Sequence, residues 1–68
     1  MKQVSGKRMC RALKKRGWVL VRTKGSHHAF QHPEFPHTII VPVHGNKNLK
    51  PGTPHGIMKD AGLADDDL

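Results

Sequence analysis

The apolar residues near the start of the chain recur at the spacing of a helix. Met9 and Leu13 lie on one stripe, and most residues between and beside them are lysine or arginine. Ser5 can cap this helix, because its hydroxyl can accept a bond from a free N–H of the first turn. Gly17 follows a basic last turn, which suits the position just after a helix end. The pattern predicts a helix over about residues 6–16.

Three later segments are rich in β-branched and aromatic residues, which is typical of strands. The predicted strands are residues 18–23 (WVLVRT), 26–32 (SHHAFQH) and 37–43 (HTIIVPV). Lys24-Gly25 predicts a tight turn between the first two, because glycine tolerates positive φ. Residues 33–36 (PEFP) form the next connection, and Pro42 indicates that the third strand lies at an edge, since proline cannot donate to a ladder.

A second, shorter helix is expected after a polar loop over residues 44–52. Thr53 can cap it, and Pro54 then takes the first helical position, which proline favours. Gly62 ends it. The resulting order, α-β-β-β-α, predicts an α+β fold in which two helices cover one face of a three-stranded antiparallel sheet.

One hydrophobic core is expected, because a chain of this length forms a single domain over residues 1–68. The sheet is expected to contribute Trp18 or Val19, with Val21, Phe30, Ile39 and Val41. The helices are expected to contribute Met9, Leu13, Ile57, Met58 and Leu63. The acidic tail, residues 64–68, is expected to be flexible.

The charge narrows the choice of partners. Twelve lysines and arginines oppose five acids, which gives a formal net charge of +7, and three of those acids lie together at residues 65–67. Such an excess favours encounters with polyanions, so we expect nucleic acid or an acidic protein as a partner. A single cysteine, Cys10, excludes an intramolecular disulfide. No apolar run is long enough for a membrane span or a signal peptide, so we expect a cytoplasmic protein.

Histidines gather in KGSHHAFQHP, residues 24–33. Side chains alternate across a strand, so if Phe30 points into the core, His28 and His32 lean the same way and His27 faces away. The adjacent pair His27 and His28 therefore cannot share one role. His28 and His32 would be about 13 Å apart along a strand, too far for one small ion, and we expect no metal site and no cofactor.

Proton transfer is a second possible role for a histidine here. An imidazole can remove the proton of an RNA 2′-OH, which allows attack on the adjacent phosphorus without a metal. Nearby cations would hold the phosphate: Arg22 and Lys24 precede His27, and Lys47 and Lys50 lie in the loop after the third strand. Composition alone favours an inert surface position for any single histidine.

Four segments together resemble the HicA toxin family of bacterial toxin–antitoxin systems. They are RGWVLVRTK, GSHHAFQHP, TIIVPVHGNKNLKPGT and IMKDAGL, and the resemblance runs from about Ser5 to Leu63. It implies a fold like that of double-stranded-RNA-binding domains. It also implies an mRNA interferase that cuts without a metal or the ribosome, and a HicB-type antitoxin as partner. The start of the second helix departs from the family, because Pro54, His55 and Gly56 replace good helix formers.

The resemblance also implies a site. The family's active histidine follows a Gly-Gly or Gly-Ser pair, which corresponds to His27 after Gly25 and Ser26. The residues expected to contact the RNA are Lys24, Ser26, His28, Lys47 and Lys50. For His44 we favour a structural role. The alternative function is a non-catalytic RNA-binding module, which would grip the RNA backbone without a catalytic histidine.

Overall fold

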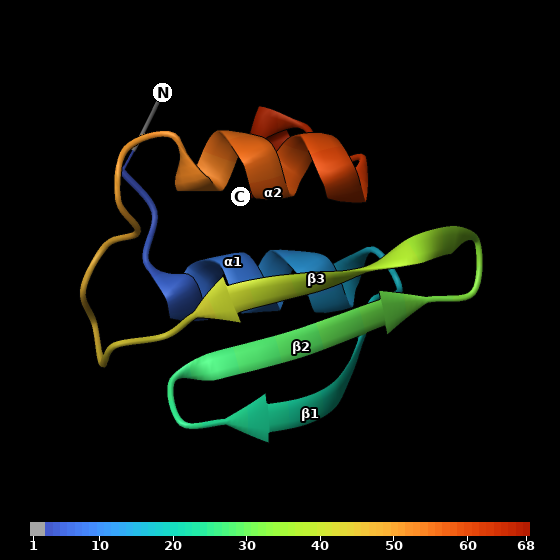
Figure 1. The fold of residues 1–68 in the computed structure, drawn as a ribbon. Coiled ribbons are helices and arrows are strands. Elements are labelled where there is room, and N and C mark those ends of the chain that lie inside the picture. Colours follow the sequence, from blue (N-terminus) through green and yellow to red (C-terminus); the bar gives the residue numbers. More distant parts are fainter. Residues whose placement is uncertain (1–2) are drawn as a thin grey trace.

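The computed structural model describes residues 3–68 and confirms the order α-β-β-β-α. The elements are α1 (Gly6–Lys15), β1 (Val19–Lys24), β2 (His27–His32), β3 (Phe35–Pro42), α2 (Thr53–Ala61) and the short 3₁₀ helix η1 (Asp65–Asp67). The strands pair antiparallel in the order β1-β2-β3. Helix α1 lies behind the sheet and α2 lies along β3, while the front face of the sheet carries no helix from residues 3–68 (Figure 1).

Helix α1 begins at the predicted residue and ends one residue earlier than predicted, with Arg16 as its C-cap. The Ser5 backbone is extended, and its hydroxyl oxygen accepts a 3.1 Å hydrogen bond from the backbone N–H of Arg8. Gly17 follows the helix with φ of 94°, a left-handed conformation that glycine adopts without steric strain. These two features fix the length of the helix and direct the chain into β1.

The turns differ from the prediction by one or two residues. Strand β1 continues through Lys24, so the turn is Gly25-Ser26 and not Lys24-Gly25. Gly25 has φ of 58° and Ser26 does not have positive φ, which is the pattern of a type II′ turn. The connection expected over residues 33–36 is also shorter, because β3 already starts at Phe35. This strand accommodates Pro36 because it lies at the edge of the sheet.

The core between the helices and the sheet confirms most of the expected residues. Those confirmed as buried are Trp18, Phe30, Ile39, Val41, Met9, Leu13, Ile57 and Met58. Val21 was expected in the core but is 50% exposed, because it is the extra residue of a β-bulge between Leu20 and Arg22. Leu63 is only partly buried. Val4 and Leu49 also join the core, and both come from segments that lack a helical or strand pattern.

Helix α2 begins at the residue that was predicted to be its cap. Gly52 is the N-cap, and Thr53 is already helical, so the expected capping by Thr53 is wrong. Pro54 still lies in the first turn, and Gly62 ends the helix with φ of 70°. The glycine cap supplies no side-chain acceptor, so the free N–H groups of this first turn have no capping bond from that residue.

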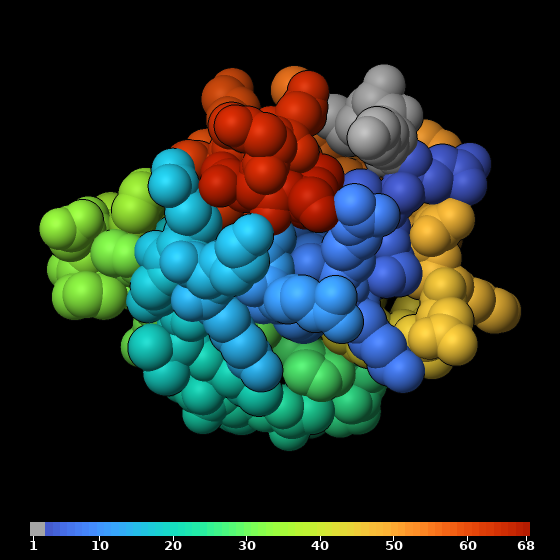
Figure 2. Space-filling model, turned by 180° about the vertical axis from the view of Figure 1, so that it is seen from behind, coloured from blue at the N-terminus to red at the C-terminus, as the bar shows by residue number. Residues whose placement is uncertain are grey.

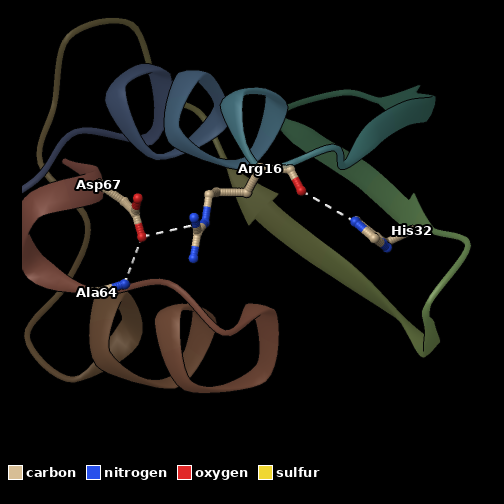
Figure 3. Close-up of polar contacts among 4 residues, drawn as sticks. All are labelled: Arg16, His32, Ala64 and Asp67. Carbon is tan, nitrogen blue, oxygen red and sulfur yellow. Dashed lines mark hydrogen bonds and ion pairs between the residues drawn. The ribbon is translucent and has the colours of Figure 1, made fainter.

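The acidic tail lies against α1. The Asp67 carboxylate is 3.5 Å from Nε of Arg16 and accepts a 2.8 Å hydrogen bond from the backbone N–H of Ala64 (Figure 3). The guanidinium of Arg8 donates to the backbone oxygen of Leu68 at 2.9 and 3.2 Å. Figure 2 shows the tail beside the helix on the back of the molecule. The flexibility expected for residues 64–68 is a property of motion and stays a prediction.

Both main helices are short. Within residues 3–68, neither α1 nor α2 has the length and apolar character that a bilayer-crossing helix requires.

Candidate active site

The two adjacent histidines of β2 lie on opposite faces of the sheet. Residues directly opposite each other on neighbouring strands share a face. His28 pairs with Val41, which is buried under the helices, whereas His27 pairs with Pro42 and with Lys24. His27 is exposed and His28 is half-buried. The alternation of side chains along the strand predicted this separation. His27 therefore lies on the face that no described helix covers, here called the open face.

The bulge in β1 determines which cations accompany His27. Beyond the bulge, Lys24 pairs with His27 and Arg22 pairs with Ala29. Without the extra residue, the pairing found at Leu20 and Phe30 would continue and place Arg22 opposite His28, on the helix face. The bulge therefore brings Arg22 and Lys24 onto the open face, where Lys24 lies across from His27 and Arg22 lies across from Ala29.

Three other histidines are held by hydrogen bonds. His28 shares a 3.2 Å hydrogen bond between Nδ1 and the backbone oxygen of Ser26, and His37 one of 2.7 Å between Nε2 and the oxygen of Asp60. His32 donates from Nε2 to the oxygen of Arg16 at 3.1 Å (Figure 3). Its Nδ1 accepts from the N–H of Glu34 at 3.0 Å. No such bond holds the His27 ring to another group in residues 3–68. Its nitrogens are thus available to a ligand.

Lys47 and Lys50 line a groove that reaches the neighbour of His27 on β3. The groove also contains Pro42 and His44, and Pro42 is the direct neighbour of His27 across the sheet. Both lysines are exposed, so the groove adds two positive charges beyond Pro42. His44, for which the sequence suggested a structural role, also lines this groove. No local sequence motif indicates this position, because it depends on how the loop after β3 folds.

Ser26 and His28 are placed differently from the other expected contacts. The backbone oxygen of Ser26 accepts a 2.7 Å hydrogen bond from the N–H of Val43, in addition to the bond from His28. Ser26 therefore joins the β1–β2 turn to the end of β3. The structure places Lys24 directly across from His27, and it places Lys47 and Lys50 in the groove that contains Pro42, the other neighbour of His27. The His28 ring lies on the other side of the sheet.

The possible metal ligands are dispersed. In the part of the chain that the structure describes, no three side chains of histidine, cysteine, aspartate or glutamate come together as a metal site. The site on the open face instead combines one unbonded imidazole with Arg22 and Lys24. Such a set can move a proton and hold a phosphate group at the same place.

The family of the chain follows from comparison with known proteins. The family model described as HicA toxin of bacterial toxin–antitoxin systems matches residues 6–63 of the 68-residue chain. No curated protein matches the chain significantly. The family match begins at the first residue of α1, ends just after Gly62 and includes His27 and all its cationic neighbours. The chain therefore belongs to the HicA toxin family and is the toxin of a toxin–antitoxin system.

Proposed function

We propose that the protein is an endoribonuclease that cleaves mRNA with His27 as its general base or acid and needs no metal ion. The observation that supports this proposal is the His27 ring itself. It is exposed on the open face, has no hydrogen-bond partner in residues 3–68, and lies directly across from Lys24 on the neighbouring strand. An exposed imidazole beside a cation fits a ribose hydroxyl and its phosphate.

The reaction uses the substrate's own nucleophile. His27 accepts the proton of a 2′-OH, and the 2′ oxygen forms a bond to the adjacent phosphorus. The bond from phosphorus to the 5′ oxygen breaks, and that oxygen takes a proton from the imidazolium or from water. The products are a 2′,3′-cyclic phosphate and a free 5′-OH. A single imidazole can serve in both proton transfers because histidine titrates near neutral pH.

The neighbouring cations stabilise the phosphate. Negative charge increases on the phosphate oxygens as the 2′ oxygen attacks, and fixed cations lower the energy of that state. Lys24 is closest to His27 in the pairing of the strands, and Arg22 lies further back along β1. Lys47 and Lys50 lie in the groove beyond Pro42 and would contact phosphates of the flanking nucleotides.

A HicB-type antitoxin is the proposed inhibitor, in the cytoplasm where the mRNA substrate is found. The open face offers such a protein both charge and apolar area. Val19 is 58% exposed and Ile40 is 45% exposed, and both share this face with His27. An acidic partner that covers these residues would be attracted by the cations and would exclude RNA by occupying the same surface.

The test compares His27→Ala with His55→Ala, an exposed histidine of α2. Purified proteins are incubated with labelled mRNA in EDTA, and their folding is checked by circular dichroism. We expect His27→Ala to reduce cleavage by at least about 10²-fold, the usual contribution of a general base, and His55→Ala to retain it. Full cleavage by folded His27→Ala would refute the proposal. Binding of intact RNA by the wild type would favour the non-catalytic module.

A further inference from the structure

A second positive surface lies on the helix side of the sheet. Lys7, Arg11 and Lys14 are spaced four and three residues apart on α1, so their side chains lie on one stripe of the helix. All three are exposed and face a groove between α1 and the sheet. The groove, here called the helix groove, is lined by Lys7, Cys10, Arg11, Lys14, Leu20, His28 and Val43.

His28 contributes one free nitrogen to the helix groove. A carbonyl oxygen can only accept, so the bond to Ser26 requires the proton of the neutral ring to be on Nδ1. This bond holds the ring in place and leaves Nε2 unbonded to any group in residues 3–68. In the neutral ring, Nε2 can accept a hydrogen bond from a ligand in the groove. In the imidazolium, Nε2 would donate a hydrogen bond to a phosphate oxygen.

No negative charge opposes these cations within the groove. None of its lining residues is acidic. Burial raises the pKa of the Cys10 thiol, and the smaller opposite effect of Lys14 does not cancel it, so the thiol stays neutral at pH 7. The other flank of α1 differs, because its groove contains Asp67 and Leu68 together with Arg8 and Lys15. Lys7 and Arg11 line both grooves, whereas Lys14 lines the helix groove and not the groove of the acidic tail.

We propose that the helix groove binds the phosphate backbone of the same RNA that His27 cleaves. This inference rests on the proposed function, since it assumes an RNA substrate. His27 and His28 are consecutive residues, so the open face and the helix groove meet at the β1–β2 hairpin. A single strand that passes around Gly25-Ser26 would contact Lys24 on one side. On the other side it would follow the stripe of cations that starts with Lys7, at the hairpin end of α1, and ends with Lys14. A Cβ at Gly25 would meet no atom within 4 Å, so the space beside this residue of the turn is open.

Two adjacent lysines of α1 provide a matched test. Lys14 lines the helix groove, whereas Lys15 lines the groove on the opposite flank, where the acidic tail lies. Lys14→Gln and Lys15→Gln remove the same charge from neighbouring positions of one helix. Each is made in a His27→Ala background, which prevents cleavage, and binding of a labelled single-stranded RNA is measured by fluorescence anisotropy at several salt concentrations.

We expect Lys14→Gln to weaken binding several-fold. It should also reduce the slope of log K against log salt by about 0.7, which is what neutralising one phosphate contributes on a single strand. Lys15→Gln should change the slope much less. Equal effects of the two variants would show a general charge effect and overturn the inference. Unchanged RNA binding with weakened antitoxin binding would assign the groove to protein and also overturn it. Failure of the His27→Ala parent to bind RNA at all would instead refute the proposed function.

Discussion

Nε2 of His32 donates a 3.1 Å hydrogen bond to the backbone oxygen of Arg16, which ties the end of β2 to the residue that follows α1 (Figure 3). The same ring packs against Trp18, with 5.3 Å between centroids, and against Phe35, at 5.1 Å. His32 therefore joins the helix, the sheet and the core with one side chain, and we assign it a structural role and not a catalytic one.

Gly17→Ala should destabilise the protein because of this ring. The new Cβ would lie 2.9 Å from Nε2 of His32, and the backbone has φ of 94°. The left-handed backbone alone costs an L-residue about 1–2 kcal/mol, so we expect a total decrease of roughly 2–3 kcal/mol in the free energy of unfolding. Urea denaturation measures it. In a His32→Ala background the steric clash is absent, and the effect of Gly17→Ala should fall to the backbone part. An unchanged effect would contradict the assigned contact.

Two helical glycines should respond in opposite directions to alanine. A Cβ at Gly6 would clash with the backbone oxygen of Pro42, so Gly6→Ala should lower stability by about 2 kcal/mol or more. Gly56, within α2, has open space around it, so Gly56→Ala should raise stability by about 0.5–1 kcal/mol. Thermal unfolding of both variants tests the pair. A stabilised Gly6→Ala would mean that α1 and β3 are not in the close contact seen at Pro42.

Lys24→Gln should reduce RNA cleavage by about tenfold, which corresponds to roughly 1.4 kcal/mol of transition-state stabilisation. The reason is its position directly across the strand pair from His27. Lys59→Gln, on α2, removes the same charge at a distance and should leave the rate near that of the wild type. Single-turnover rates at saturating protein separate this effect from weaker binding. Equal rates for the two variants would exclude a role for Lys24 in the reaction.

Cys10 should react slowly with alkylating reagents. Burial is the main cause that raises the pKa of its thiol, while Lys14 acts weakly in the opposite sense. A raised pKa means that folding favours the neutral thiol. This preference adds to the free energy of unfolding. Its contribution is fully present at pH values below the ordinary thiol pKa and disappears as the pH rises through the pKa of Cys10 in the folded protein. We expect iodoacetamide to label the folded protein more slowly than the urea-unfolded protein at about pH 8. Mass spectrometry measures the labelling directly, because the chain has one cysteine. Equal labelling rates would contradict the burial.

The sequence predicts the elements well because their signals are local. Ser5, Gly17 and Gly62 act through their own backbone or the adjacent turn, and each does so in the structure as expected. Val21 could not be assigned correctly, because the bulge depends on how two strands pair and not on either strand alone. Thr53 does not cap α2 because Gly52, which has positive φ, is the N-cap, so the helix begins at Thr53, one residue earlier than predicted.

The site was predictable only in part, for the same reason. Alternation along one strand separates His27 from His28 without knowledge of any other segment. The position of Lys47, Lys50 and His44 beside Pro42 depends on how the loop after β3 folds back, and the sequence contains no periodic pattern there. The helix groove also required the structure, because it combines residues of α1 with residues that are distant in the chain.

The extra residue in β1 also affects how copies of the protein behave toward one another. β1 is an outer strand, and one of its sides has N–H and C=O groups that another strand could pair with. The bulge interrupts the regular spacing of those groups, and Arg22 and Lys24 add like charges that repel a second copy. One inserted residue thus opposes edge-to-edge aggregation of the toxin and, by the same shift in pairing, orients both cations beside His27.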